Sequence, residues 1–155
     1  MEVKIKKLHP NAVIPKYESA GAAGMDLTAT SKHYDENGCV VYGTGLAFEI
    51  PENHVGLLFP RSSNAKKDLL LSNSVGVIDS DYRGEVIFKF KPSIYYSVDG
   101  TPELTEVPLH HLNNYEVGDR IGQIIIMPYP KIEFIEVEEL DKTERGNGGF
   151  GSSGV

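Results

Sequence analysis

The sequence predicts an all-β fold, and three observations support this prediction. Short runs of β-branched, aromatic and other apolar residues, each about the length of one strand, recur along the chain. Gly, Pro, Asn and Asp bound these runs at short spacing, as expected of turns. Only one segment has the features of a helix, which favours a sandwich, jelly roll or barrel over a parallel sheet. We therefore expect a distorted, jelly-roll-like β fold with one short helix.

The expected strands follow from these runs in chain order. In residues 85–90 the side chains of Val86, Phe88 and Phe90 share one face, which should point into the core. In residues 132–137 the apolar pattern changes phase between Phe134 and Ile135, which predicts a bulge or a strand contacted on both faces. The expected strands are residues 3–5, 45–50, 54–59, 75–78, 85–90, 121–127 and 132–137.

The remaining segments define the organisation of the chain. The expected helix covers about residues 64–70 and follows the potential caps Ser62, Ser63 and Asn64. A polar excursion from about residue 92 to 115 interrupts the β pattern. The length of 155 residues suits one domain. We divide it into a body of residues 1–141 and a flexible, glycine-rich arm of residues 142–155.

Composition limits the classes of partner. The formal net charge of −7 disfavours binding to a nucleic-acid backbone, although a few arginines can still hold a small anion. Cys39 is the only cysteine, so an intrachain disulfide is excluded and a reducing, cytoplasmic compartment fits best. No run approaches the roughly 20 apolar residues that a membrane span needs. We expect a soluble protein that binds neither nucleic acid nor membrane.

Several polar segments are candidates for chemistry, each with a plain structural alternative. In residues 73–84 an apolar strand is expected to enter a β-hairpin, where Asp79 either forms the turn or activates a water, and Asn73 and Tyr82 are placed to contact a base and a sugar. The segment Pro60 to Ser63 either caps the helix or binds an anion. Gln123 after a tight turn, and Asp26 in an early turn, are weaker candidates.

The last eleven residues, RGNGGFGSSGV, contain five glycines around Arg145 and Phe150. A segment so rich in glycine is costly to order unless something docks it. Arginine can bind phosphate and phenylalanine can stack on a base, so the tail is either a lid for a nucleotide or an ordinary unstructured terminus. No helix follows the glycines, so they do not form a dinucleotide-binding turn.

Taken in order, five motifs resemble those of the trimeric deoxyuridine triphosphatases (dUTPases). They are AGMDL at residues 23–27, PRSS at 60–63, NSVGVIDSDYRG at 73–84, GDRIGQ at 118–123 and RGNGGFGSSG at 145–154. The resemblance covers nearly the whole chain and departs from the family only at the excursion. It implies a jelly-roll-like subunit in a homotrimer, with sites assembled from several subunits and closed by the C-terminal arm.

The implied reaction is hydrolysis of dUTP to dUMP and pyrophosphate, which limits uracil incorporation into DNA and supplies dUMP for thymidylate synthesis. Magnesium (Mg2+) is implied as the cofactor, held by the triphosphate and waters, with Asp26 as outer support. Asp79 is implied as the residue that activates water, Tyr82 as the sugar contact and Arg145 as a clamp at the γ-phosphate. The other implied substrate contacts are Arg61, Ser62, Ser63 and Gln123 at the phosphates, Asn73, Gly76, Val77 and Ile78 at uracil, and Gly149, Phe150, Gly151 and Ser152 in the arm, with Phe150 over the base.

Two alternatives remain at this level. Deoxycytidine triphosphate deaminases share the fold, but they carry a catalytic glutamate on the strand after the hairpin, where this chain has Lys89. A regulatory module on the same fold is the second alternative, with a protein partner bound at the 92–115 excursion through Tyr95 and Tyr96.

Overall fold

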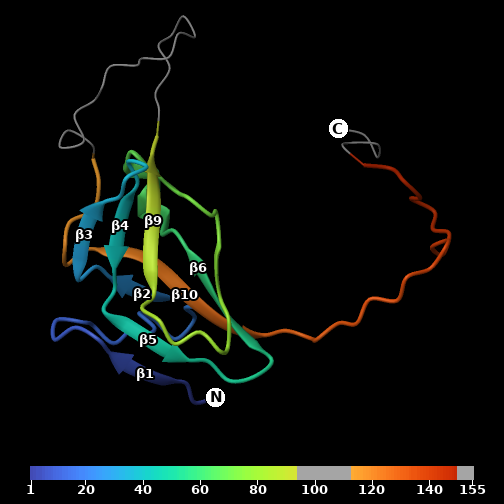
Figure 1. Ribbon diagram of the computed structural model, residues 1–155, viewed down its shortest axis with the longest axis horizontal. Coiled ribbons are helices and arrows are strands. Elements are labelled where there is room, and N and C mark those ends of the chain that lie inside the picture. Colours follow the sequence, from blue (N-terminus) through green and yellow to red (C-terminus); the bar gives the residue numbers. More distant parts are fainter. Residues whose placement is uncertain (94–112, 150–155) are drawn as a thin grey trace, which may run out of the picture.

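The computed structural model describes residues 1–93 and 113–149, which fold almost entirely into β structure (Figure 1). In this part of the chain, no helix is long and apolar enough to cross a membrane. The elements are β1 (Lys4–Lys7), β2 (Met25–Thr28), β3 (Ser31–Tyr34), β4 (Val40–Gly43), β5 (Leu46–Glu49), β6 (His54–Phe59), the 3-10 helix η1 (Ser62–Lys66), β7 (Leu69–Leu71), β8 (Gly76–Ile78), β9 (Ile87–Pro92) and β10 (Arg120–Pro128).

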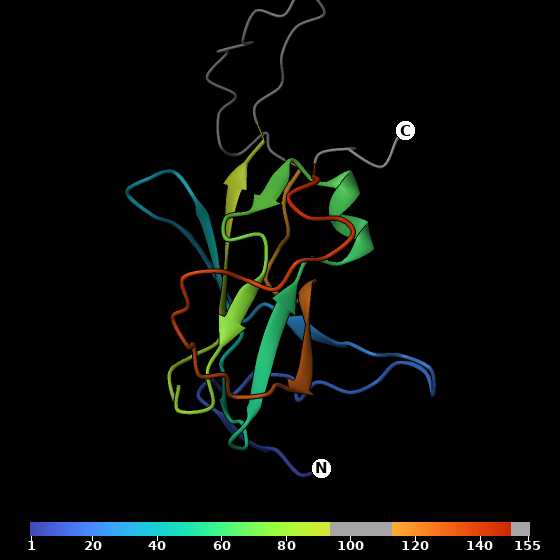
Figure 2. The same cartoon turned by 90° about the vertical axis from the view of Figure 1, so that its right-hand side faces the viewer.

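Two four-stranded sheets form the body. One has the strand order β2-β10-β6-β8 and the other has the order β3-β4-β9-β7, while β1 and β5 make a separate two-stranded sheet. All the pairings are antiparallel. Figure 2 shows β6 between the short strand β8 and the orange strand β10. The predicted all-β fold is confirmed.

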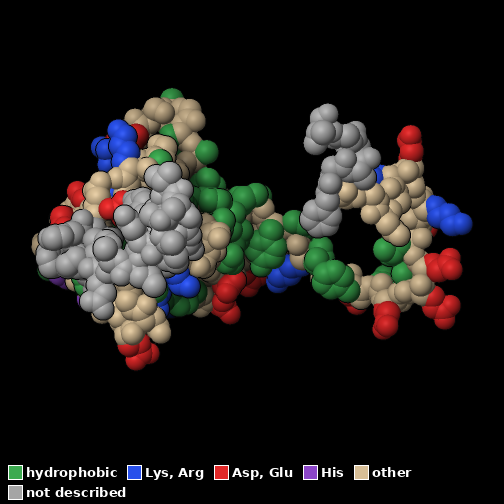
Figure 3. Space-filling view, turned by 90° about the horizontal axis from the view of Figure 1, so that it is seen from above, with side chains coloured by type: hydrophobic (Ala, Val, Ile, Leu, Met, Phe, Trp, Pro, Cys, Tyr) green, Lys and Arg blue, Asp and Glu red, His purple; other side chains and the backbone are tan. Residues whose placement is uncertain are grey.

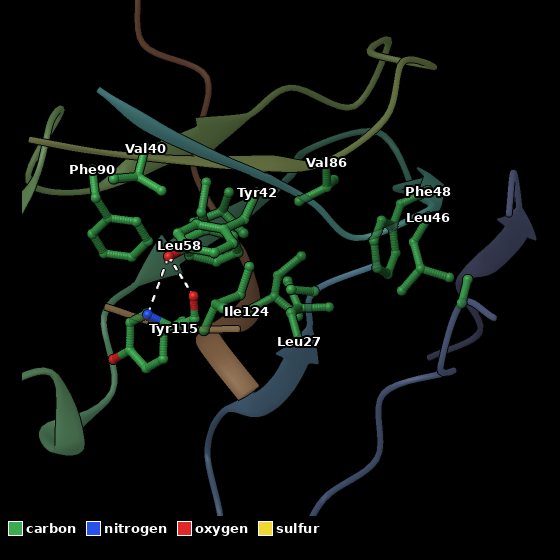
Figure 4. Close-up of a cluster of buried hydrophobic side chains, with 14 of the residues drawn as sticks. Leu27, Val40, Tyr42, Leu46, Phe48, Leu58, Val86, Phe90, Tyr115 and Ile124 are labelled. Carbon is green, nitrogen blue, oxygen red and sulfur yellow. Dashed lines mark hydrogen bonds between the residues drawn. The ribbon is translucent and has the colours of Figure 1, made fainter. Parts of the chain in front are cut away.

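The core lies between the two large sheets. β9 contributes Phe88 and Phe90, and Val86 precedes it; the three side chains are at most 1% exposed, as their alternation predicts. From the facing sheet, Leu27 and Ile124 are fully buried in the same cluster (Figure 4). Full burial of side chains of this size stabilises a fold by about 1.5–3 kcal/mol each, so this cluster holds the sheets together.

The local predictions about the helix and the strands need correction. The helix begins at Ser62 and ends at Lys66, because the leucines after it form the strand β7, where Leu69 is buried and β9 is the hydrogen-bonding partner. The N-cap residue, Arg61, makes no capping hydrogen bond with its side chain, so the expected side-chain cap is wrong. Strands β2, β3, β4 and β7 were not predicted.

The segment of residues 73–84 is not a hairpin. β8 pairs with β6 in one sheet, whereas β9 pairs with β4 and β7 in the other. Residues 79–86 therefore cross between the sheets, and the two strands that they connect, β8 and β9, do not pair with each other. Val86 ends the crossing, where its N–H donates to Leu46 O at 2.8 Å and its C=O accepts from the Thr44 hydroxyl at 2.7 Å.

Residues 132–137 form no strand, and the bulge expected there is wrong. A strand needs a partner edge, and Figure 1 shows this segment leading away from the body. Phe134 is 90% exposed and Ile135 82%. The irregularity lies instead in β10, whose register against β2 shifts between Arg120 and Gly122.

Part of the 92–115 excursion lies outside the described residues. Its two described ends meet at one residue: Ser93 N–H donates to Asp68 O at 2.8 Å, and Asn113 N–H donates to Asp68 Oδ2 at 2.8 Å. The excursion therefore begins and ends beside the turn that follows η1.

Candidate active site

The sheet register brings three of the five motifs together. Gln123 on β10 lies opposite Asp26 on β2 and opposite Phe59 on β6. Because Phe59 leads directly into Pro60 and Arg61, the arginine turn begins beside the same point of the sheet. We call the cluster of Asp26, Arg61, Ser63, Arg120 and Gln123 the arginine corner.

Asp26 organises the arginine corner through its two oxygens. Asp26 Oδ1 lies 2.9 Å from Arg61 Nε, and Oδ2 lies 3.1 Å from Arg120 Nη1. Arg61 Nη1 also donates to Ser63 Oγ at 3.3 Å. Glu18 approaches Arg120 at 3.8 Å, but both side chains are about half exposed, and solvent weakens such a pair. One carboxylate thus holds two guanidinium groups, which leaves positive charge for an anion.

The position of Gln123 depends on a glycine. Gln123 Nε2 donates to Pro60 O at 3.1 Å, so its amide lies against the start of the arginine turn. A Cβ atom at Gly24 would lie 2.5 Å from Gln123 Oε1. Gly24 therefore leaves the space that this side chain occupies.

A second group of predicted residues surrounds β8. Among the residues that the structure describes, this strand is at the edge of its sheet and pairs only with β6, so no described strand covers its other edge. The Val77 side chain is 61% exposed on it. Asn73 and Asp79 are also exposed, at the two ends of the segment that contains β8. Ser74, with a φ of 60°, makes the turn between β7 and β8.

The ring of Tyr82 folds back over its own turn. Tyr82 N–H donates to Asp79 O at 3.1 Å, and the Tyr82 hydroxyl donates to Glu85 O at 3.0 Å. A Cβ atom at Gly84 would overlap the Tyr82 ring. The absence of a side chain at Gly84 therefore leaves the space in which the Tyr82 ring lies.

One copy of the chain does not bring the two groups together. β2 and β8 are opposite edges of the sheet, separated by β10 and β6, which corresponds to about 14 Å. Ile78 pairs with Gly56, whereas Asp26 is level with Phe59, a further offset of about 10 Å along the strands. The arginine corner and Asp79 therefore lie at distant corners of one sheet.

The arm also lies apart from both groups where it is described. Figure 1 shows the chain beyond β10 extending away from the body. Arg145 Nε donates to Gly148 O at 2.8 Å, within the arm itself, and Gly149 is the last described residue. Phe150, Gly151 and Ser152 lie outside the described residues.

Two residues that form ion pairs in the structure were not identified from the sequence. Arg120 appeared in the sequence only within the GDRIGQ motif, with no role assigned, and its pairing with Asp26 follows from the β2–β10 register. Lys89 on β9, the residue that argued against a deaminase, forms an ion pair with Asp35, which directly follows β3 of the same sheet. Neither partner is near in sequence, so no local signal could have revealed these pairs.

The fold and the two groups of residues together indicate a hydrolase that acts on a small phosphorylated ligand. The family model described as dUTPase matches residues 10–94 and 112–154. The chain therefore belongs to the dUTPase family, and the resemblance of the five motifs is confirmed.

Relatives and solved structures agree with this assignment. The deoxyuridine 5'-triphosphate nucleotidohydrolase of Wolinella succinogenes is 39% identical over 160 residues, covering 99% of this chain and 95% of the relative. That of Nautilia profundicola is 40% identical over 159 residues, covering 99% of each. A mutant dUTPase of Staphylococcus bacteriophage 80alpha, solved with dUpNHpp, aligns with a TM-score of 0.77 at 30% identity over 99% of both chains. The predicted class of enzyme, a nucleotide hydrolase, is confirmed.

Proposed function

We propose that this chain carries out the reaction of its family, hydrolysis of dUTP to dUMP and pyrophosphate, with Asp79 as the general base. Asp79 is exposed at the end of β8, and the open edge of that strand runs beside it. This arrangement is the observation that carries the assignment. A nucleotide whose uracil is bound at the edge of β8 would have its α-phosphate near the Asp79 carboxylate. Asp79 takes a proton from water, the water oxygen bonds to the α-phosphorus, and the bond to the pyrophosphate oxygen breaks.

Uracil recognition is assigned to the open edge of β8. Backbone N–H and C=O groups of Gly76, Val77 and Ile78 that do not pair with β6 are available for the polar edge of a pyrimidine. The Asn73 side chain is exposed beside them and adds an amide donor and acceptor. A rigid edge discriminates well, because a base with the wrong donors leaves polar groups unpaired. Tyr82 is assigned to the sugar, against which its ring excludes a 2′-hydroxyl.

The arginine corner is assigned to the phosphates. Arg61 and Ser63 are already joined by a hydrogen bond, and Ser62 is exposed at the start of η1. Gln123 adds an amide at the same place. Fixed donors of this kind stabilise charge that develops on transferring phosphoryl groups.

The residues present fit magnesium held mainly by the substrate. Among the described residues, no group of three or more His, Cys, Asp or Glu side chains could hold a metal ion. Asp26 uses both oxygens for arginines, so its role toward a metal is indirect. When bound, Mg2+ would neutralise charge on the triphosphate. The dUTPase of phage phi11 is described with a structural Mg(II) ion, although at 24% identity it shares only the fold with this chain.

The separation of the two groups supports the proposed homotrimer, in which each site uses residues of more than one subunit. Since Asp79 and the arginine corner are at distant corners of one copy, a site that uses both is built from the corner of one subunit and the β8 edge of another. The segment after β10 offers an apolar contact for assembly (Figure 3): among its exposed residues are the large apolar side chains of Ile132, Phe134, Ile135, Val137 and Leu140. Such a density of exposed large apolar residues is typical of an interface.

The division into a body of residues 1–141 and an arm of residues 142–155 belongs to the same proposal. Arg145 and Phe150 are assigned to the γ-phosphate and the uracil ring, with Gly149, Gly151 and Ser152 as arm contacts. Closing an arm over a bound nucleotide excludes bulk water and strengthens the electrostatic contacts inside. We place the enzyme in the cytoplasm, in keeping with the buried free thiol of Cys39.

Pyrophosphate release from dUTP, UTP, dTTP and dCTP in the presence of magnesium tests this function. The intact chain should release pyrophosphate from dUTP alone. Asp79→Asn should bind dUpNHpp as tightly as the intact chain but hydrolyse dUTP at least about 100-fold more slowly. Release from none of the four nucleotides would contradict the proposal, and ammonia release from dCTP would favour the deaminase.

One observation keeps a regulatory role as a second candidate. The dUTPase of phage 80alpha is described as having a SaPI-inducing capacity linked to its enzymatic activity, and it is 30% identical to this chain. The family model leaves residues 95–111 unmatched, inside the 92–115 excursion that contains Tyr95 and Tyr96. If a partner protein binds there, deletion of residues 95–112 should abolish its binding and leave dUTP hydrolysis intact.

A further inference from the structure

The turn that carries the phosphate contacts is short and weakly supported by its own backbone. η1 is a five-residue 3-10 helix with no side-chain cap at Arg61. Its backbone closes with only short-range bonds, from Asn64 N to Arg61 O and from Lys67 N to Asn64 O, both at 2.9 Å. A 3-10 turn of this length has poor hydrogen-bond geometry, so its side chains need support from elsewhere.

Tyr115 supplies a contact from behind this turn. Its side chain is only 3% exposed, and its hydroxyl donates to Asn64 Oδ1 at 3.2 Å. Burial raises the pKa of Tyr115, while a hydrogen bond with Ser63 and the charge of Arg61 act against that rise. The hydroxyl therefore faces the turn from the protein interior, with Asn64 as its hydrogen-bond partner.

The Tyr115 ring is itself fixed on several sides (Figure 4). The Tyr42 hydroxyl donates to Tyr115 O at 2.8 Å and accepts from Tyr115 N–H at 3.1 Å. The Tyr42 ring meets the Tyr115 ring edge to face at 6.1 Å, and Phe90 lies at 5.9 Å. Lys67 Nζ lies 5.0 Å from the ring centroid and donates to Asn114 O at 2.8 Å.

Asn64 transmits this support to the rest of the turn. Its Nδ2 donates to Leu69 O at 2.9 Å, so the same amide joins Tyr115 on one side to the start of β7 on the other. Asn113 Nδ2 donates to Lys66 O at 2.6 Å and closes the far end of η1. The phosphate-binding face of the turn is thus backed by a continuous set of hydrogen bonds that ends in the core.

We propose that Tyr115 is a positioning residue for phosphate binding: through Asn64 it holds the Arg61–Ser63 turn in the geometry that receives the triphosphate. This inference rests on the proposed function of that turn. Tyr115 touches no substrate atom in this assignment. Its effect should therefore be confined to the phosphate part of the ligand, because the uracil-binding edge of β8 belongs to a separate group of residues.

The test compares two ligands on the full-length chain with Tyr115→Phe, which keeps the ring and removes the hydroxyl. Affinity for dUpNHpp should fall by about fivefold to tenfold, the worth of one hydrogen bond. Affinity for deoxyuridine, which lacks phosphates, should be unchanged. The matched control is Thr44→Val, which removes another buried hydroxyl, bonded to Val86 O at 2.7 Å and distant from η1, and should leave both affinities as they are.

A double-mutant cycle with Asn64→Ala tests the path. If Tyr115 acts through Asn64, the double variant should bind dUpNHpp about as weakly as Asn64→Ala alone. Three outcomes would overturn the inference and leave the proposed function standing. The losses of dUpNHpp affinity could be additive in the double variant, or Tyr115→Phe could lose affinity equally for dUpNHpp and deoxyuridine, or Tyr115→Phe could lose affinity for neither. If the intact chain binds neither ligand, the proposed function fails, and the inference fails with it.

Discussion

Asp26 on β2 joins two arginines from different parts of the chain, Arg61 just before η1 and Arg120 on β10: its Oδ1 lies 2.9 Å from Arg61 Nε and its Oδ2 lies 3.1 Å from Arg120 Nη1. The Asp26 side chain is only 17% exposed, so this arrangement is sheltered from solvent on the carboxylate side. The two guanidinium groups are oriented before any ligand arrives. Such preorganisation reduces the cost of arranging charge at the moment of reaction.

Asp26→Asn should therefore slow hydrolysis. An amide offers one acceptor oxygen, so it can hold only one of the two guanidinium groups. Displacement of catalytic groups by about 1 Å costs up to about 100-fold, and we expect kcat/KM for dUTP to fall at least about tenfold. Glu18→Gln makes the same change of charge at the exposed, 3.8 Å contact to Arg120 and should remain close to wild type. Equal losses in the two variants would show that net charge alone matters.

Gly84→Ala should weaken selection of the sugar. The new methyl group would overlap the Tyr82 ring and displace it from the position it now has. We expect the preference for dUTP over UTP, measured as the ratio of the two kcat/KM values, to fall about tenfold or more. Gly21→Ala is the control, because a Cβ atom there meets nothing within 4 Å. If Gly84→Ala keeps the preference for dUTP over UTP, the position of the Tyr82 ring does not determine which sugar is accepted.

The apolar segment after β10 should hold the subunits together. In Phe134→Ser/Ile135→Ser, two side chains that are 90% and 82% exposed in one copy become polar. Each such side chain would contribute about 1.5–3 kcal/mol if buried between subunits. Light scattering should show loss of the trimer, together with loss of activity. The paired control Glu133→Ser/Glu136→Ser changes exposed neighbours and should keep the trimer; dissociation of both variants would point away from apolar contact.

Removal of the arm should separate assembly from catalysis. A chain that ends at Glu144 lacks Arg145 and Phe150 but keeps residues 132–140. We expect the oligomer and its melting temperature to be retained, and dUTP turnover to fall about 100-fold or more, since the arm would supply fixed charge and exclude water. Full turnover by the shortened chain would mean that the arm is not a lid.

The ion pair of Lys89 with Asp35 should make stability depend on pH in the acid range. The hydrogen bond from Lys89 holds the pKa of Asp35 below its ordinary value of 3.8. A lowered pKa in the folded state gives stability that is present above pH 3.8 and is lost as the pH falls through the folded-state pKa. Lys89→Met should therefore flatten the fall in melting temperature below about pH 4. If the melting temperature of Lys89→Met falls below pH 4 as steeply as that of the intact chain, this ion pair does not contribute to the pH dependence of stability.

The sequence was most informative where a pattern was local. Alternation in residues 85–90 correctly predicted that Val86, Phe88 and Phe90 face the core, and β6 was placed at its observed bounds. Prediction from the sequence failed where the pairing of distant strands decides whether a segment becomes a strand and which strand it joins. Residues 132–137 have the composition of a strand but no partner edge among the described residues of one copy, and β8 joins β6 instead of forming a hairpin with the strand that follows.

By itself, the sequence determined the class of fold and the family and named the candidate site residues, because apolar alternation and motif composition are properties of neighbours in the chain. Only the tertiary structure decided which of those residues meet. It placed Asp26 between Arg61 and Arg120, set the Tyr115 hydroxyl behind the arginine turn, and separated the β8 edge from both. The physical reason is strand register, since hydrogen bonding between strands distant in sequence fixes which side chains come within reach.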